Sequence, residues 1–211
     1  MIGDYTIKNA HDDLIWKVIT LPNNRIASCS FDYSIKIWKS NPPYSDTPIK
    51  VLEGHSSGVK SLLYIKERDI LISGSWDETL RIWNMSTYQC DKVIDGVYCY
   101  YTNSLYQIDK DRVIVGEGSW FKSFSIVNID KCVIEKTIKD ESLGAVKCFL
   151  KLRDNKTILC GCSYGFCFYD MNTEQYKITK NNHNAITDLL FKDDNTFLSC
   201  SDDKTIKVWR Y

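Results

Sequence analysis

The stretch ISGSWDETLRIW occupies residues 72–83, and two stretches of the same design occur elsewhere: ASCSFDYSIKIW at 27–38 and LSCSDDKTIKVW at 198–209. Each contains a cluster of small residues, an aspartate at its sixth position and a closing tryptophan. Alignment on the closing residue gives five anchors along the chain: Trp38, Trp83, Val127, Tyr169 and Trp209. Their spacing of 40–45 residues is the period of a four-stranded propeller blade, so we predict five repeats.

The residues around these anchors have the patterns of β-strands. In the second repeat, residues 59–65 and 69–75 are rich in apolar residues that favour strands, and residues 79–83 alternate between apolar and polar. Short polar segments rich in Asp, Asn, Ser and Lys separate them, as expected for turns. No segment shows a sustained helical period. The sequence therefore predicts an all-β fold.

The overall composition narrows the class of protein. The chain has 211 residues, enough to bury a substantial core, with 27 basic and 27 acidic side chains. A formal net charge of zero argues against a general binder of nucleic acid or membrane surfaces, which depends on a basic face. The first residues contain no apolar run typical of a signal peptide. Nine cysteines then indicate reduced thiols in an intracellular protein, cytoplasmic or nuclear.

The repeats resemble the WD40 family, whose pattern is a Gly-His pair followed by a core that ends in Trp-Asp. Gly54 and His55 form such a pair, and His55 precedes Trp83 by 28 residues. His11 and His183 hold similar places in the first and last repeats. None of the three closing tryptophans is followed by aspartate, which departs from the family pattern. The resemblance implies a β-propeller of five four-stranded blades.

The resemblance also implies a buried chain of hydrogen bonds in each well-formed blade, from a loop histidine through a serine and a turn aspartate to the closing tryptophan. Buried polar groups need such partners. Three sets match: His11, Ser28, Asp32 and Trp38; His55, Ser73, Asp77 and Trp83; His183, Ser199, Asp203 and Trp209. In the third and fourth repeats Phe121 and Ser163 replace the aspartate, yet we expect both to form blades.

Each set contains the residue types of a Ser-His-Asp catalytic triad. An active site is rarely present three times at a structural period, so we interpret the sets as structural and expect no enzyme, no catalytic residue and no cofactor. The spacing of Cys160, Cys162 and Cys167 does not match the Cys-x2-Cys pairs usual in zinc sites, and no histidine remains to assist. We therefore expect no metal site.

The two ends of the chain complement each other. Residues 5–11 resemble residues 176–183, which we expect to include an outer strand. We therefore predict one domain, 1–211, with residues 1–10 supplying the outer strand that closes the last blade; the repeats span about 11–52, 53–94, 95–139, 140–180 and 181–211. The alternative is an open ring, or part of a seven-blade propeller that a partner completes.

Two positions in each repeat are expected on one loop surface. The position before the turn aspartate reads Phe31, Trp76, Trp120, Cys162 and Asp202 along the five repeats. The position after the first apolar residue of the opening strand reads Trp16, Lys60, Lys147 and Thr187. Their aromatic and charged members are candidates for partner binding, because exposed aromatic residues form binding hot spots. The alternative is that these rings pack on neighbouring loops.

The resemblance implies a platform for other proteins, with the top face and channel mouth as contact surface. The predicted function is a non-catalytic protein–protein interaction scaffold within a multiprotein complex. The alternatives are a reader of lipid headgroups or nucleic acid on a blade edge, and an enzyme. We expect other proteins or peptides as partners, with neither nucleic acid nor membrane, and the sequence does not set the oligomeric state. A cluster of Trp16, Phe31 and Trp76 would suit a peptide with an apolar or basic anchor.

Overall fold

The computed structural model describes residues 5–101, 104–118, 120–180 and 184–210. The chain forms two compact units, residues 1–96 and 97–211. Within the described ranges the structure is built of strands, and the one helical element is a 3₁₀ turn, η1 (Lys66–Arg68). No helix in this part of the chain has the length and apolar character to cross a membrane.

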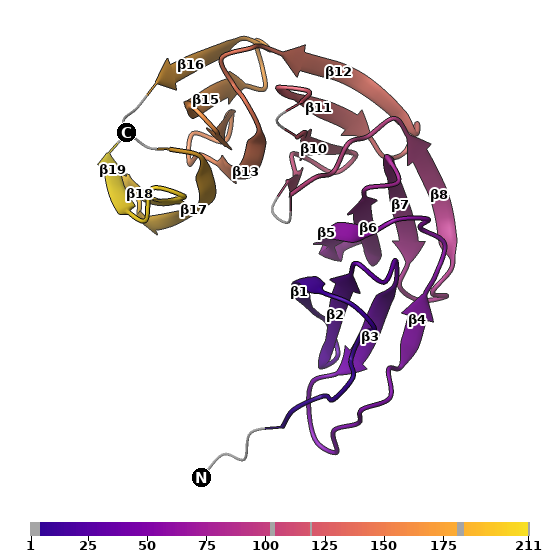
Figure 1. The fold of residues 1–211 in the computed structure, drawn as a ribbon. Coiled ribbons are helices and arrows are strands. Elements are labelled where there is room, and N and C mark those ends of the chain that lie inside the picture. Colours follow the sequence, from indigo (N-terminus) through magenta and orange to yellow (C-terminus); the bar gives the residue numbers. More distant parts are fainter. Residues whose placement is uncertain (1–4, 102–103, 119, 181–183, 211) are drawn as a thin grey trace. The chain divides into compact units, whose positions relative to one another are not determined.

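The first unit contains two antiparallel sheets, each with four strands in chain order (Figure 1). Sheet one consists of β1 (Ile15–Leu21), β2 (Arg25–Ser30), β3 (Ile35–Lys39) and β4 (Lys50–Leu52). Sheet two consists of β5 (Val59–Ile65), β6 (Ile70–Ser75), β7 (Thr79–Asn84) and β8 (Cys90–Asp95). Strands β1 and β5, the first of each sheet, lie against each other.

The core of this unit lies between its two sheets. Ala27, Ile35 and Ile37 of sheet one are fully buried against Leu62 and Leu71 of sheet two. Strand β6 is buried along its whole length because both of its faces are covered, and it accordingly reads as a nearly continuous run of apolar and small residues. Burial of this apolar surface holds the two sheets together.

The second unit contains three further antiparallel sheets, again in chain order (Figure 1). Sheet three consists of β9 (Leu105–Gln107), β10 (Arg112–Gly116), β11 (Ser123–Asn128) and β12 (Val133–Lys139). Sheet four consists of β13 (Val146–Lys151), β14 (Thr157–Cys162), β15 (Gly165–Asp170) and β16 (Tyr176–Lys180). Sheet five consists of β17 (Ile186–Asp193), β18 (Thr196–Ser201) and β19 (Ile206–Arg210).

Two apolar clusters hold the second unit together. Phe124 of sheet three packs edge-on against Tyr169 of sheet four, with ring centroids 5.6 Å apart. Phe166 of sheet four packs edge-on against Phe197 and Trp209 of sheet five, at 5.6 and 5.0 Å. The third and fourth repeats therefore form blades although they lack the turn aspartate, because their strands still bury apolar residues on both faces.

The five sheets confirm the predicted all-β fold of five blades, whereas the predicted closing strand stays a prediction. In the described residues, sheet five has three strands, and residues 5–10 belong to no strand. Tyr5 instead stacks on Tyr44 with ring centroids 4.6 Å apart and donates a hydrogen bond to Asp46 at 2.9 Å. The Lys8 backbone N–H donates to the same carboxylate at 3.3 Å. These contacts hold the segment on the β3–β4 loop.

The closing tryptophans of sheets one and two are buried, so their loss should destabilise the protein. Trp83 is 2% exposed, so we expect Trp83→Ala to destabilise the protein by about 3–5 kcal/mol, as for other truncated buried aromatics. Thermal and denaturant unfolding measure this. Trp120→Ala is the control, since that side chain is 90% exposed and its loss should change stability by less than about 0.5 kcal/mol. An unchanged melting temperature for Trp83→Ala would contradict the assignment.

Candidate functional site

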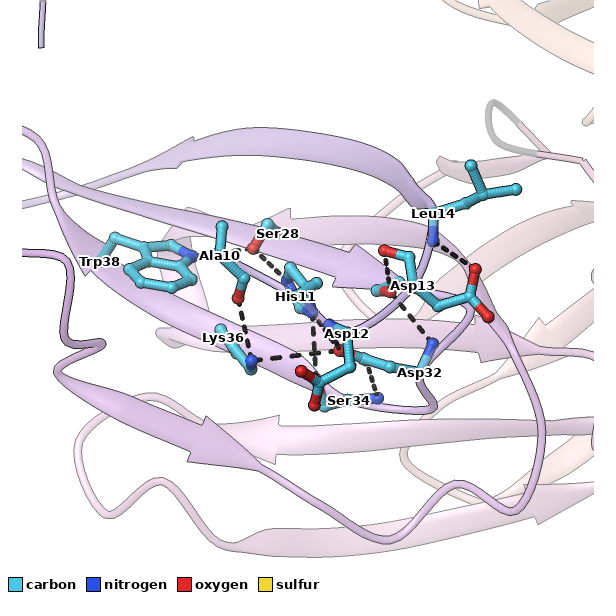
Figure 2. A network of polar contacts seen from close by, with 11 residues as sticks. Ala10, His11, Asp12, Asp13, Leu14, Ser28, Asp32, Ser34, Lys36 and Trp38 are labelled. Carbon is cyan, nitrogen blue, oxygen red and sulfur yellow. Dashed lines mark hydrogen bonds and ion pairs between the residues drawn. The ribbon is translucent and has the colours of Figure 1, made fainter. Parts of the chain in front are cut away.

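Sheet one contains a continuous chain of polar contacts that begins at its closing tryptophan (Figure 2). The Trp38 indole Nε1 donates to Ser28 Oγ at 2.8 Å. Ser28 Oγ lies 2.7 Å from His11 Nε2, and His11 Nδ1 lies 2.8 Å from Asp32 Oδ2. The chain joins β3 to β2, to the turn between them and to the loop before β1. These hydrogen bonds therefore tie four segments of the repeat together.

The direction of these hydrogen bonds follows from the carboxylate and the histidine. The Asp32 carboxylate can only accept, so His11 Nδ1 carries the proton. In the neutral imidazole Nε2 accepts the Ser28 O–H, and Ser28 Oγ accepts the Trp38 indole N–H. Burial lowers the pKa of His11, and its contacts with Asp32, which act in the opposite direction, offset this only in part.

Asp32 accepts several further hydrogen bonds in the turn after β2. Its Oδ1 accepts the Ser34 N–H at 2.9 Å and the Ser34 O–H at 2.6 Å, and its Oδ2 accepts the Asp12 N–H at 3.1 Å. Burial on its own would raise the pKa of Asp32, but these hydrogen bonds, with that from His11, lower it to about 2. They also hold Tyr33 in the left-handed region, with φ at 73°, against a strain of about 1 kcal/mol.

Sheet two repeats the arrangement. Trp83 donates to Ser73 Oγ at 2.8 Å, and His55 lies 2.7 Å from both Ser73 Oγ and Asp77 Oδ2. Burial alone would raise the pKa of Asp77, but the contacts with His55 and Thr79 hold it well below its usual range. Two neighbouring repeats thus connect the same four residue types by equivalent hydrogen bonds.

Sheets four and five retain parts of this chain of hydrogen bonds. In sheet five Trp209 donates to Ser199 Oγ at 2.7 Å, whereas His183 lies outside the described residues. In sheet four Ser163 stands in the place of the turn aspartate, and its hydroxyl accepts the backbone N–H of Ala145 at 3.1 Å. The serine therefore still contacts the backbone before the opening strand, although two residues further along than the aspartates of sheets one and two do.

Sheet three has a different buried polar group. Glu117 is 4% exposed, and its carboxylate accepts the hydroxyl of Ser125 at 2.6 Å and that of Ser123. Phe121, at the turn position, stacks on Tyr98 with ring centroids 4.0 Å apart. Sequence reasoning missed Glu117, because one glutamate in one repeat has no periodic counterpart that would single it out.

A hydroxyl two residues after the turn aspartate was also missed. This hydroxyl donates to the aspartate Oδ1 at 2.6, 2.7 and 2.6 Å in three repeats: Ser34 to Asp32, Thr79 to Asp77 and Thr205 to Asp203. The sequence carried the signal, since a serine or threonine follows two residues after the aspartate in all three quoted stretches. The side chain completes the turn by supplying the second donor to one carboxylate oxygen.

The serine, histidine and aspartate contacts resemble those of a catalytic triad, but the serines are not accessible. Ser28 is 3% exposed and Ser73 is 0% exposed. Each Oγ already accepts a tryptophan N–H and donates to a histidine. A nucleophilic serine must present its oxygen to a substrate. The geometry of these two sets therefore supports structure and not acyl transfer.

A β-bulge opens four of the five sheets. Ile15 pairs with Ser30 and Lys17 pairs with Cys29, so Trp16 is an extra residue between two ladder positions. The same irregularity falls at Lys60, Lys147 and Thr187. A bulge redirects the side chain of the extra residue. The opening-strand position singled out in the sequence thus coincides with this bulge.

The structure brings four of the candidate contact residues together in the first unit. Lys60 Nζ lies 2.8 Å from the Trp16 ring centroid and 5.0 Å from that of Trp76. Phe31 meets Trp76 edge-on, with ring centroids 5.3 Å apart. Trp76 is 37% exposed, whereas Trp16 and Phe31 are half-buried. We refer to Trp16, Phe31, Lys60 and Trp76 as the aromatic surface.

The remaining candidates lie in the second unit. Lys147 Nζ forms an ion pair with Asp202 Oδ2 at 2.9 Å and lies 5.2 Å from the Tyr101 ring centroid. Trp120 projects from the turn before β11 and is almost fully exposed. At the bulge and turn positions that form the aromatic surface in the first unit, the second unit therefore has an ion pair and an exposed ring.

All nine cysteines are free thiols. Cys160, Cys162 and Cys167 are buried in sheet four, and burial raises the pKa of the Cys162 thiol well above its usual value. A protonated thiol is a poor metal ligand. In the described ranges no group of three or more His, Cys, Asp or Glu side chains could hold a metal ion.

Comparison with known proteins finds one family. The family model described as WD domain, G-beta repeat (WD40) matches residues 5–39, 46–84 and 174–210, just over half of the chain.

Three curated proteins illustrate the similarity. Nuclear distribution protein nudF of Aspergillus niger is 44% identical over 72 residues, 34% of this chain and 16% of that protein. The WD repeat-containing protein 89 homolog of Dictyostelium discoideum is 25% identical over 172 residues, 79% of this chain and 45% of that protein. The peroxisomal targeting signal 2 receptor of Dictyostelium discoideum is 43% identical over 60 residues, 28% of this chain and 19% of that protein. The chain thus spans less than half the length of these relatives.

Among solved structures, the chain is similar to the computationally designed Ika8 protein, with a TM-score of 0.73 and 22% sequence identity. The match covers 95% of this chain and 59% of that chain. At this identity the similarity supports the fold alone.

The burial of the neutral His11 should make the stability of the protein depend on pH. Its pKa is lower in the folded state than in the unfolded chain, so the unfolded chain takes up a proton first as the pH falls. The contribution of His11 to stability is therefore present above about pH 6.5 and is lost as the pH falls through the folded pKa. Denaturant unfolding at pH 7.5 and 5.0 should show this loss, and His11→Asn should reduce it. The Asp32 carboxylate, with its pKa of about 2, stays ionised throughout. An equal loss in both proteins would contradict the neutral imidazole.

Proposed function

The chain belongs to the WD40 family, whose propellers generally bind other proteins, and we propose that it is a non-catalytic interaction scaffold in an intracellular multiprotein complex. The contact surface in this proposal is the loop side of the blades, where the aromatic surface lies. Other proteins or peptides are its partners. Nine free thiols support the intracellular setting, because such thiols persist in reducing compartments.

The aromatic surface is the observation that carries the proposal. Trp76 exposes more than a third of its side chain next to Phe31, and both project from turns held by the aspartate contacts. Aromatic residues on a rigid support lose little entropy on binding and are enriched in hot spots. The polar chains beneath fix the turns, so the surface is ordered before a partner arrives.

Catalysis has no comparable support. Members of the WD40 family are generally non-catalytic, and Ser28 and Ser73 are buried in completed hydrogen-bond chains. The relatives carry names that point to different cellular roles, nuclear distribution and a peroxisomal targeting receptor, and each spans far more chain than is present here. The proposal therefore takes from the family the capacity to bind proteins and leaves the pathway open.

The test is partner capture by the purified chain from cell extract, compared between the wild type and Trp76→Ala. Loss of a hot-spot aromatic should weaken capture at least about tenfold, since such residues contribute about 2 kcal/mol or more. Thermal unfolding of the variant should stay close to that of the wild type, because the side chain is partly exposed. Val93→Ala, on the outer strand β8 and 40% exposed, is the control and should capture normally. Equal capture by Trp76→Ala would count against the proposal.

A further inference from the structure

Lys60 lies on the aromatic surface without a negatively charged partner. Its side chain is only 6% exposed, and the ammonium group faces the rings of Trp16 and Trp76. In the part of the chain that the structure describes, no carboxylate is paired with it. Burial accordingly lowers the pKa of Lys60 to about 8. The ring faces stabilise the cation only in part, because a cation–π contact is weaker than a buried ion pair.

Trp16 contributes a second unpartnered donor beside this ammonium. Its indole Nε1 is buried and has no hydrogen-bond acceptor among the described residues. A buried donor without an acceptor costs about 1–3 kcal/mol. The ring that bears this N–H is the one that Lys60 covers, so both donors lie within one small region.

The second unit shows what satisfies a lysine in this setting. Lys147 occupies the same bulge position in β13 as Lys60 in β5, and it also lies near an aromatic ring, that of Tyr101. There the Asp202 carboxylate, from a turn position, completes the site at 2.9 Å. Asp202 comes from the repeat that follows Lys147, and the same position in the repeat that follows Lys60 is Trp120. The turn positions of the first unit are Phe31 and Trp76, so none of these positions supplies a carboxylate.

The charge of Lys60 also selects among ligands. Aromatic rings alone would suit a basic anchor, but the ammonium already occupies the ring faces and repels a second cation. A carboxylate carries one negative charge and balances the one ammonium, whereas a phosphate group would leave an excess. The neighbouring rings of Phe31 and Trp76 can cover the apolar residues that flank an acidic side chain.

We propose that Lys60, with Trp16 and Trp76, binds the carboxylate of a glutamate or aspartate in an extended segment of a partner protein. The inference rests on the proposed function and specifies the chemistry of the partner. The carboxylate takes the place over Lys60 that Asp202 takes over Lys147, and the aromatic surface holds the adjoining apolar residues.

The test uses the full chain and blocked nine-residue peptides that have one glutamate between two leucines in a Gly-Ser frame. Twins replace the glutamate by glutamine, lysine or phosphoserine. Calorimetric titration should show the glutamate peptide binding about tenfold or more tightly than the glutamine twin, as for a charge-assisted hydrogen bond. Lys60→Met should remove this preference, Lys60→Arg should retain it, and the matched variant Lys147→Met should leave it unchanged.

A second readout needs no variant. The glutamate peptide should protect Lys60 of the wild type from an amine-acylating reagent, while the glutamine twin should not, as measured by peptide mass spectrometry. This covers the case in which Lys60→Met does not fold.

The outcomes separate the two proposals. Equal binding of the glutamate and glutamine twins, tighter binding of the phosphoserine or lysine twin, or no binding of any twin at millimolar concentration would each overturn the carboxylate site. Such results would leave the interaction scaffold to the capture experiment with Trp76→Ala, which does not depend on an acidic ligand.

Discussion

The need to satisfy the indole N–H of a buried tryptophan organises each well-formed blade. Ser28 Oγ accepts the Trp38 indole N–H and donates to the neutral His11, and His11 donates to the Asp32 carboxylate. The chain of bonds ends in a turn, where the carboxylate also accepts backbone donors. Packing in the core and the shape of the loop surface are thereby coupled, since a change at the tryptophan reaches the turn through three hydrogen bonds.

The degraded repeats show which part of this arrangement a blade requires. In place of the histidine and aspartate of sheets one and two, sheet three has the buried Glu117 and sheet four has only the Ser163 hydroxyl at the turn. Both still form four-stranded sheets, because their apolar residues are buried on both faces. Burial of apolar surface is therefore sufficient for the sheet, while the polar chain determines the conformation of the turn that follows β2 and β6.

Sequence reasoning reached the repeat, the strand content and the residues of the polar chain, because each recurs at a fixed period that one chain displays several times. It did not reach Glu117, which has no periodic counterpart. The contacts of Tyr5 with Tyr44 and Asp46 were not predicted either, because the resemblance of residues 5–11 to the β16 segment says nothing about the β3–β4 loop. The cover of Trp16 by Lys60 was equally hidden, since it depends on two neighbouring strands.

The bulge in the opening strand separates adaptation from folding. Its extra residue takes no place in the ladder, so the strands keep their pairing whether that residue is the tryptophan of β1, the lysine of β5 and β13 or the threonine of β17. These positions can therefore be substituted one blade at a time without a change in the register of the strands. A designer who wishes to give this scaffold a new specificity would begin at the same four sites.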